Sequence, residues 1–203
     1  MTSDHPHIHA FDFDGTLTYT DSFTAFLIWE CGQAHVAAAF VKHPYMLWNY
    51  LRTRDRGALK SHLLFNLMGP IDKDALQDRF SAFARETADR LFRPDAMQTW
   101  ADVAGEKTLR VIVTASPEML VGEFGKRLGA DRTIGTRLGF DDQGQLTPHL
   151  DGPNCRGEEK VRRLKAVYGE NLSLEAAYGD TSGDHEMLRA ARQGYYRRFV
   201  QKP

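Results

Sequence analysis

The chain has 203 residues, enough for one good core or for one domain that carries a sizeable insertion. Apolar residues make up 42% of it, charged residues 26%, and the formal net charge is −1, so the overall charge gives no basis for binding nucleic acid or an anionic membrane. No uninterrupted apolar run reaches the ~18 to 20 residues of a membrane span, and the polar start of the chain lacks the apolar centre of a signal peptide. We therefore expect a cytoplasmic protein with no integral membrane segment.

The cysteines and the first histidines carry no clear metal or disulfide signal. Cys31 and Cys155 have neither pairing nor ligand spacing, which suits structural roles in a reducing compartment. His5, His7 and His9 alternate near the start of the chain, and we expect them to belong to a frayed entry to the first strand rather than to a metal site.

The first predicted elements are one short strand and a long helical block. Residues 8–13 form an apolar strand that runs into an acidic turn. From residue 21 to about residue 92, apolar residues recur at helical spacing without any strand signal, with breakers at Pro44, Gly57 and Gly69-Pro70. An aromatic stretch at residues 36–51 is expected to form part of the core of this block rather than a lipid groove.

The remainder alternates between helices and strands. The pattern predicts helices at 96–104, 121–128, 158–168 and 184–192, strands at 109–113, 176–178 and 195–200, an extended segment at 132–140 and a hairpin turn at 141–144. Such alternation implies an α/β fold, with a parallel sheet covered by helices on both faces. Ligands bind at the carboxyl ends of such strands, so a block inserted after the first strand would cover the site as a cap.

The acidic turn after the first strand is the most informative feature. Asp12 and Asp14 are two residues apart, so in an extended chain their side chains point to the same side, and Gly15 permits the abrupt turn that follows. Adjacent carboxylates repel each other unless a cation or a shared proton relieves them. Mg²⁺, which prefers oxygen ligands, meets that demand.

Three later segments bring further polar groups to strand ends. Thr114 and Ser116 follow the strand at 109–113, where hydroxyls and helix-start amides can bind an anion. Lys160 lies early in a helix after a loop, and Asp180 and Asp184 follow the strand at 176–178. Ser116 and its neighbour Glu118 are explained equally well by helix capping and by substrate contact.

With these segments the chain resembles the haloacid dehalogenase-like hydrolase superfamily. Its four motifs occur in order along essentially the whole chain: Asp-x-Asp-Gly-Thr, a strand ending in Ser or Thr, a lone Lys, and Gly-Asp-x-x-x-Asp. The helical block and the segment Thr-Ala-Ser-Pro-Glu are similar to the phosphoserine-phosphatase-like branch. This resemblance implies a Rossmann-like core at residues 1–20 and 93–203 with a helical cap at 21–92.

The resemblance also implies a role for each motif residue. Asp12 would be the nucleophile that forms an aspartyl-phosphate, and Asp14 the general acid and then the base. Mg²⁺ would be bound by the Asp12 side chain, the Asp14 backbone carbonyl and Asp180, with Asp184 beside them as a direct or water-mediated ligand. The phosphoryl oxygens would be held by Thr114 and Lys160.

The substrate is predicted less well. Phosphoserine-cleaving relatives carry a Glu where this chain has Asp21, and a cap Arg where our alignment places His62, with Lys60 nearby. Lysine can supply the charge but lacks the bidentate fork of arginine. The stretch at 36–51 also resembles the cap region of phosphatidylglycerophosphate phosphatases in this branch. We therefore expect a small-molecule or lipid phosphate ester as substrate, with Asp21, Lys60, His62 and Ser116 as candidate contacts.

The predicted activity is Mg²⁺-dependent phosphomonoester hydrolysis. The alternatives are a phosphoserine phosphatase and a phosphotransferase that passes the phosphoryl group to an acceptor other than water; the latter would use the same residues. A dehalogenase needs no proton donor because a halide leaves unprotonated, so Asp14 argues against it. A non-catalytic phosphate-binding protein would be favoured by loss of Asp12 or Asp14, and both are present.

Overall fold

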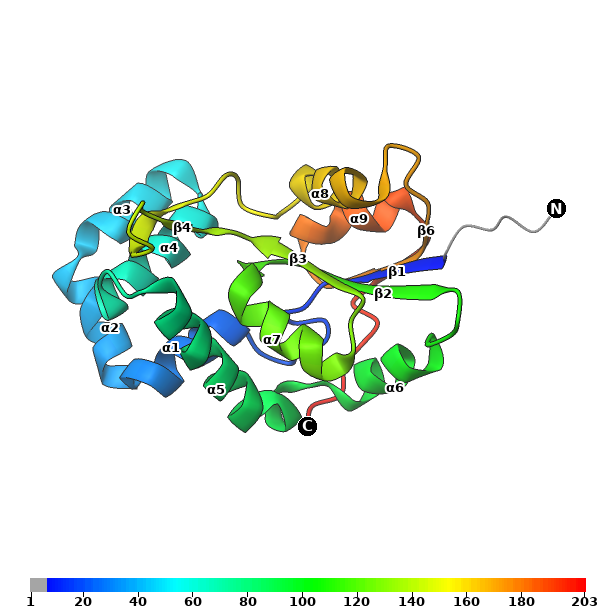
Figure 1. Ribbon diagram of the computed structural model, residues 1–203, viewed down its shortest axis with the longest axis horizontal. Helices are drawn as coiled ribbons and strands as arrows, with labels where there is room; N and C mark the ends of the chain where they lie inside the picture. Colours follow the sequence, from blue (N-terminus) through cyan, green and yellow to red (C-terminus); the bar gives the residue numbers. More distant parts are fainter. Residues whose placement is uncertain (1–6) are drawn as a thin grey trace.

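The centre of the protein is a five-stranded parallel sheet, seen in a computed structural model that describes residues 7–203 (Figure 1). Its order is β3-β2-β1-β6-β7, and all neighbours run parallel. The strands are β1 (His7–Phe11), β2 (Thr108–Pro117), β3 (Arg132–Thr136), β6 (Leu174–Gly179) and β7 (Ala191–Tyr196). Central β1 is paired on both sides, with Phe11 opposite Ile112 and Tyr178. The carboxyl ends of β1, β2 and β6 therefore meet at one edge of the sheet.

Helices cover both faces of the sheet, as the sequence predicted. One face carries α6 (Pro94–Asp102) and α7 (Glu118–Leu128), and the other carries α8 (Glu158–Tyr168) and α9 (His185–Ala190) (Figure 1). Alternation along β1 explains this arrangement. The Phe11 ring lies 4.9 Å from that of Trp100 in α6, whereas Ala10 belongs to the opposite core cluster with Leu164 of α8.

Six helices lie between β1 and β2, and we call the first five of them the helical insertion. They are α1 (Ser22–Cys31), α2 (Gln33–Lys42), α3 (Pro44–Thr53), α4 (Arg56–Met68) and α5 (Lys73–Leu91). Asp21 caps α1 by accepting a hydrogen bond from the Thr24 amide at 2.7 Å, and Pro44 occupies the first turn of α3. Figure 1 shows α1 to α4 beyond one end of the sheet, at the left of the view.

A short antiparallel hairpin connects the core to the insertion. Its strands are β4 (Leu138–Phe140) and β5 (Leu146–Leu150), joined by the predicted turn. The Leu146 amide donates to the Ile71 carbonyl at 2.9 Å, and the Lys73 amide donates to the Gly144 carbonyl at 3.0 Å. The hairpin thereby fastens the α4–α5 connection to the core. The extended segment predicted at 132–140 is thus two strands, β3 and β4, which belong to different sheets.

Three sequence predictions about the ends of the sheet were wrong in their bounds. The last strand is β7, which begins at Ala191 instead of residue 195, and α9 ends at Ala190. Because β7 is an edge strand with mostly exposed, polar residues, its sequence lacks an apolar strand pattern. His7 and His9 lie within β1, opposite Thr108 and Arg110, so they are paired strand residues and not a frayed entry to the strand. His5 falls outside the described residues.

The aromatic stretch is not the core segment that we expected. Tyr45 is 51% exposed and Trp48 is 65% exposed, whereas Phe40 packs partly buried against the core. The reason is that α3 turns Met46 inward and leaves the Tyr45–Trp48 side of the helix to solvent. Within residues 7–203, no single helix has the length and hydropathy to cross a membrane; α1 and α2, bent by 100°, meet that requirement only as a pair, by length and composition.

Gly57 does not break a helix, contrary to the sequence prediction, but lies buried in the first turn of α4. Asp55 caps this helix through the Ala58 amide at 3.0 Å. A Cβ atom at Gly57 would lie 2.8 Å from the Cβ of Asn154 and 3.0 Å from Cδ1 of Leu150. Glycine is therefore needed here for close packing of α4 against β5 and the loop that follows it.

Gly57→Ala is expected to lower the free energy of unfolding by about 1 to 3 kcal/mol, because the added methyl group overpacks this contact. The matched control is Gly122→Ala in α7, where a Cβ meets nothing within 4 Å. That change should raise stability by roughly 0.5 to 1 kcal/mol through helix propensity alone. Urea unfolding of both variants measures the difference, and equal stabilisation by both would contradict the packing argument.

Candidate active site

The loop that leaves β1 places Asp12 and Asp14 at the carboxyl edge of the sheet. Asp12 directly follows the strand, is 6% exposed, and donates its amide to the Tyr178 carbonyl of β6 at 2.9 Å. Gly15 then takes a φ of +86°, and a Cβ there would lie 2.3 Å from Oδ2 of Asp180. Only glycine lets this loop turn sharply while passing so close to a carboxylate.

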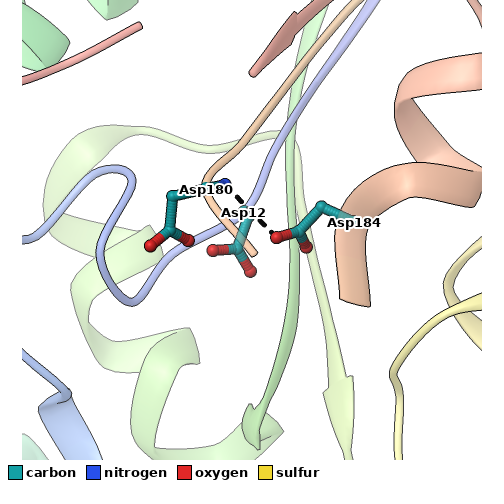
Figure 2. A group of neighbouring side chains, drawn as sticks. All are labelled: Asp12, Asp180 and Asp184. Carbon is teal, nitrogen blue, oxygen red and sulfur yellow. Dashed lines mark hydrogen bonds between the residues drawn. The ribbon is translucent and has the colours of Figure 1, made fainter. Parts of the chain in front are cut away.

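Three carboxylates converge beside this loop. Oxygen atoms of Asp12, Asp180 and Asp184 all lie within 4.8 Å of one another, and Figure 2 shows the three side chains drawn together. Thr16 donates its hydroxyl to Oδ2 of Asp12 at 3.1 Å and, more weakly, to Oδ1 of Asp180 at 3.4 Å. A set of carboxylate oxygens at this spacing fits the oxygen-rich coordination of Mg²⁺.

Lys160 is the buried cation of this group. Its side chain is 1% exposed, and Nζ donates to Oδ1 of Asp12 at 2.7 Å, to Oδ1 of Asp184 at 2.7 Å and to the Val113 carbonyl at 2.6 Å. All three ammonium hydrogens are thus satisfied. Helix α8 places this side chain against the ends of β1 and β2. The position of Lys160 in the sequence alone did not predict these contacts.

Burial and charge set the acidity of the carboxyl groups. Burial raises the pKa of Asp12 to about 7, although the Lys160 ammonium opposes that shift. Burial, and next the negative charge of Asp184, raise the pKa of Asp180. Burial also acts to raise the pKa of Asp184, but attraction to Lys160 and hydrogen bonds from Thr181 outweigh it and lower the pKa. A divalent cation would relieve this crowding of negative charge.

The Asp14 side chain lies apart from the three-carboxylate cluster. Its Oδ1 accepts the Ser22 amide at 2.6 Å, and its Oδ2 accepts the Ser116 hydroxyl at 2.5 Å. Burial and the neighbouring Asp21 raise the pKa of Asp14, an effect that Lys60 and the two serines partly oppose. Any Asp14 contribution to metal binding would therefore come from its backbone. Thr114 lies buried at the end of β2, where its hydroxyl oxygen accepts the Ser116 amide at 3.0 Å.

The helical insertion brings two predicted substrate residues to this site. Lys60 of α4 donates to Oδ2 of Asp21 at 2.8 Å and to Oγ of Ser116 at 3.2 Å.

The structure does not bring His62 to the site. A residue two positions after Lys60 on a helix points to nearly the opposite side, and the His62 ring lies by the Ala58 carbonyl and 6.0 Å from the ring of His149. Glu118 also lies apart, with its carboxylate on the Gly135 amide at 2.8 Å.

Asp12, Asp14, Asp21, Lys60, Thr114, Ser116, Lys160 and Asp184 line a cleft of about 150 Å³ between the core and the insertion, whereas Asp180 is not among its lining residues. Six of its lining residues were not among the predicted site residues: Arg56, Ala115, Asn154, Arg156, Thr181 and Gly183. Arg56 could have been found, because it precedes Lys60 by one helical turn and shares its side of α4. Asn154 and Arg156 lie in an irregular loop after the hairpin, where no periodic pattern marks a functional side chain.

Asp180→Asn is expected to abolish the stabilisation of the protein by Mg²⁺ while leaving the metal-free protein as stable or slightly more stable. The substitution removes one of three crowded carboxylates, so the repulsion that raises the Asp180 pKa disappears together with a ligand. Thermal unfolding in Mg²⁺ and in EDTA measures both effects, since a ligand at 100 times its Kd adds about 2.7 kcal/mol. The control is Asp142→Asn in the exposed hairpin turn. A Mg²⁺ shift retained by Asp180→Asn would contradict this ligand assignment.

Comparison with known proteins matches this constellation to a family. Protein CicA of Caulobacter vibrioides is 44% identical over 198 residues, covering 98% of this chain and 89% of that protein. A Bordetella pertussis protein of unknown function has a similar structure, with a TM-score of 0.72 and 21% identity over 92% of this chain and 87% of its own. A phosphoserine phosphohydrolase-like protein from Francisella tularensis has a TM-score of 0.63 and 14% identity, covering 94% and 85%. The family model for haloacid dehalogenase-like hydrolases matches residues 10–189, and the chain belongs to that family.

Proposed function

We propose that this hydrolase is a Mg²⁺-dependent phosphomonoesterase that works through an aspartyl-phosphate on Asp12. The observation that carries the proposal is the pairing of two different carboxyl groups at one strand end. Asp12 is held by Lys160 and lies within the carboxylate cluster, whereas Asp14 is held by two serines and faces the same cleft. The first environment suits a nucleophile and the second suits a group that exchanges protons.

The reaction would proceed in two displacements. A carboxylate oxygen of Asp12 forms a bond to phosphorus as the ester P–O bond breaks, and the proton of the Asp14 carboxyl passes to the leaving oxygen, so that an alcohol departs. Water then attacks the phosphorus of the aspartyl-phosphate and gives its proton to Asp14, and the Asp12–phosphorus bond breaks. Phosphate leaves and both carboxyl groups return to their starting states.

Several residues would support these displacements. Asp12, Asp180 and Asp184 would hold the Mg²⁺, together with the backbone carbonyl of Asp14. A bound Mg²⁺ would offset the negative charge that otherwise keeps a carboxylate from a phosphate. Thr114 would donate its hydroxyl hydrogen to a phosphoryl oxygen, since its oxygen already accepts the Ser116 amide.

Lys160 balances the charge of the carboxylates before and after transfer. It contacts Asp12 and Asp184 directly, so it would orient Asp12 and favour its ionised form, limiting the rise in pKa that burial causes. As Asp12 becomes phosphorylated, the ammonium would turn toward the phosphoryl oxygens.

The substrate would be a small-molecule or lipid phosphate ester. Arg56 and Arg156 add positive charge to the cleft opposite its carboxylates, while the charge of Lys60 is paired with Asp21; the two arginines favour an anionic ester. Phosphoserine is the less favoured alternative, because Asp21, the group placed to bind its ammonium, is already paired with Lys60 and caps α1. A phosphotransferase would use the same residues with another acceptor.

The test is release of inorganic phosphate from amino-acid, sugar, nucleotide and lipid monoesters, with Mg²⁺ and with EDTA. Mg²⁺-dependent release by the wild type, absent in Asp12→Asn, is the expected result. An added alcohol acceptor that captures the phosphoryl group in preference to water would favour the phosphotransferase. Release that EDTA leaves unchanged would contradict the metal assignment.

A further inference from the structure

A chain of hydrogen bonds runs from the helical insertion into the core and ends on Asp14. Asp21 accepts from Nζ of Lys60 at 2.8 Å, Lys60 donates to Oγ of Ser116 at 3.2 Å, and Ser116 donates to Oδ2 of Asp14 at 2.5 Å. Lys60 belongs to α4, whereas Ser116 lies at the end of β2. The chain therefore crosses from one part of the fold to the other, at the carboxyl group assigned to proton transfer.

The direction of these bonds follows from the chemistry of the groups. A lysine ammonium has hydrogens to donate and no lone pair to accept with, whereas a serine hydroxyl has one hydrogen and two lone pairs. When Lys60 donates to Ser116, the single hydroxyl hydrogen cannot point back and must go elsewhere. Oδ2 of Asp14 is its acceptor, at a distance typical of a strong bond to a carboxylate. Lys60 thus fixes the rotation of the Ser116 hydroxyl.

Lys60 is itself held in place from several sides. Asp21 is fixed as the cap of α1 by the Thr24 amide at 2.7 Å, and the Lys60 ammonium lies 5.2 Å from the centre of the Phe23 ring. An ammonium with these partners is a poor candidate for a freely moving substrate contact. The position of its ammonium depends instead on whether α4 packs against the core.

The other oxygen of Asp14 is also held from the insertion. Oδ1 accepts the amide of Ser22, the first residue of α1, at 2.6 Å. Two hydrogen bonds to the two oxygens of one carboxyl group fix its plane. Both depend on how the insertion meets the core, one through the start of α1 and one through Lys60 and Ser116.

We propose that Lys60 and Ser116 are positioning residues for Asp14, so that the carboxyl group is aligned for proton transfer only while α4 is seated on the core. The proposal rests on the function proposed above, in which Asp14 protonates the leaving oxygen. It changes the part assigned to both residues from substrate contact to control of the proton donor. Chemistry that needs no proton donor should then be insensitive to them.

The test compares leaving groups. Ser116→Ala, Lys60→Met and the double variant are assayed on a series from p-nitrophenyl phosphate, whose phenolate leaves unprotonated, to phenyl and alkyl phosphates. The measured quantity is kcat/KM, which covers only the steps up to formation of the aspartyl-phosphate. With alkyl phosphates we expect each single variant to lose roughly 10- to 100-fold, and with p-nitrophenyl phosphate less than about 3-fold. Lys42→Met, an exposed lysine of the same insertion, is the control and should match the wild type.

Each outcome has a definite meaning. A double variant no worse than either single one, and no further effect of Ser116→Ala in an Asp14→Asn background, would support the relay. A uniform loss across the series would indicate substrate binding or general structural damage and would overturn it, as would a Lys60→Met variant with an unchanged leaving-group dependence. A wild type that hydrolyses none of the esters would overturn the proposed function itself. An active wild type, with variants whose kcat/KM depends on the leaving group as in the wild type, would overturn the relay alone.

Discussion

Asp12→Asn is expected to reduce phosphate release by roughly 10⁴-fold or more, because an amide cannot form the covalent intermediate on which the two-step reaction depends. The fold should survive the change. Asparagine has nearly the same shape, its carbonyl oxygen can still accept from Lys160, and Lys160 keeps Asp184 and the Val113 carbonyl as partners. Removing a carboxylate whose pKa burial raises to about 7 also removes part of the cost of burying charge.

The measurement pairs activity with trapping of the intermediate. Acid-quenched wild type should carry a phosphoryl group on the peptide that contains residue 12, and the variant should carry none. Because asparagine can deamidate back to aspartate, Asp12→Ala is assayed beside it and the intact mass of each sample is checked. Thermal unfolding of both variants establishes that they are folded. Full turnover by either folded variant would exclude Asp12 as the nucleophile.

The edge of the sheet that carries this site was predictable because the rule behind it is local. Polar residues that directly follow apolar strands in a parallel sheet gather at one edge, so Asp12, Thr114 and Asp180 could be placed together from their positions in the sequence. The helices over both sheet faces followed from the same alternation. Only the periodic pattern around each residue was needed for these predictions.

The contacts made by the insertion were not predictable in this way. Which side of α4 faces the cleft depends on how the insertion rests on β5, a contact that Gly57 makes possible and that no periodicity reveals. Of the two contacts predicted on this helix, Lys60 lines the cleft and His62 lies outside it, while Arg56, which was not predicted, lines it as well. The bond from Lys60 to Ser116 joins residues 56 apart in sequence and exists only in the folded chain.

The exposed parts of the fold were also hard to predict, because hydropathy along the chain does not show which residues other elements cover. Strand β7 lies at the sheet edge with polar side chains, so its pattern does not resemble that of a buried strand. Tyr45 and Trp48 show the reverse case, in which large apolar residues at helical spacing lie in solvent. Burial depends on whether a neighbouring element covers the residue, and hydropathy along the chain does not contain that information.

Lys160→Met is expected to lower the free energy of unfolding of the metal-free protein by about 3 to 5 kcal/mol at pH 8, because it leaves buried carboxylates without their cation. Both Asp12 and Asp184 lose a hydrogen bond of 2.7 Å, and the methionine chain has no charge to replace it. Lys160→Arg should not restore stability or activity, since a larger guanidinium does not fit a site that is 1% exposed. Phosphate release should fall at least about 100-fold.

The matched control is Lys165→Met on the same helix. Lys165 pairs with Glu170 at 3.3 Å across solvent, with side-chain exposures of 41% and 85%, so its removal should cost less than about 1 kcal/mol. Urea unfolding of both variants, at constant slope, separates the buried ion pair from a general effect of losing a lysine in α8. Equal small losses would show that Lys160 does not hold the carboxylates together.

The pH dependence of the Lys160→Met loss provides the sharper measurement. Burial already raises the pKa of Asp12 to about 7, and without the ammonium that opposes this shift the pKa rises further. The folded variant then binds a proton that the unfolded chain, with an ordinary carboxyl pKa near 3.8, does not bind. Its stability must therefore fall as pH rises between these two values. In the wild type this fall ends near pH 7, whereas in the variant it continues to higher pH. We therefore expect a smaller loss at pH 5, where Asp12 is protonated in both proteins, than at pH 8, and a loss independent of pH would contradict the assignment of Lys160 as the partner of Asp12.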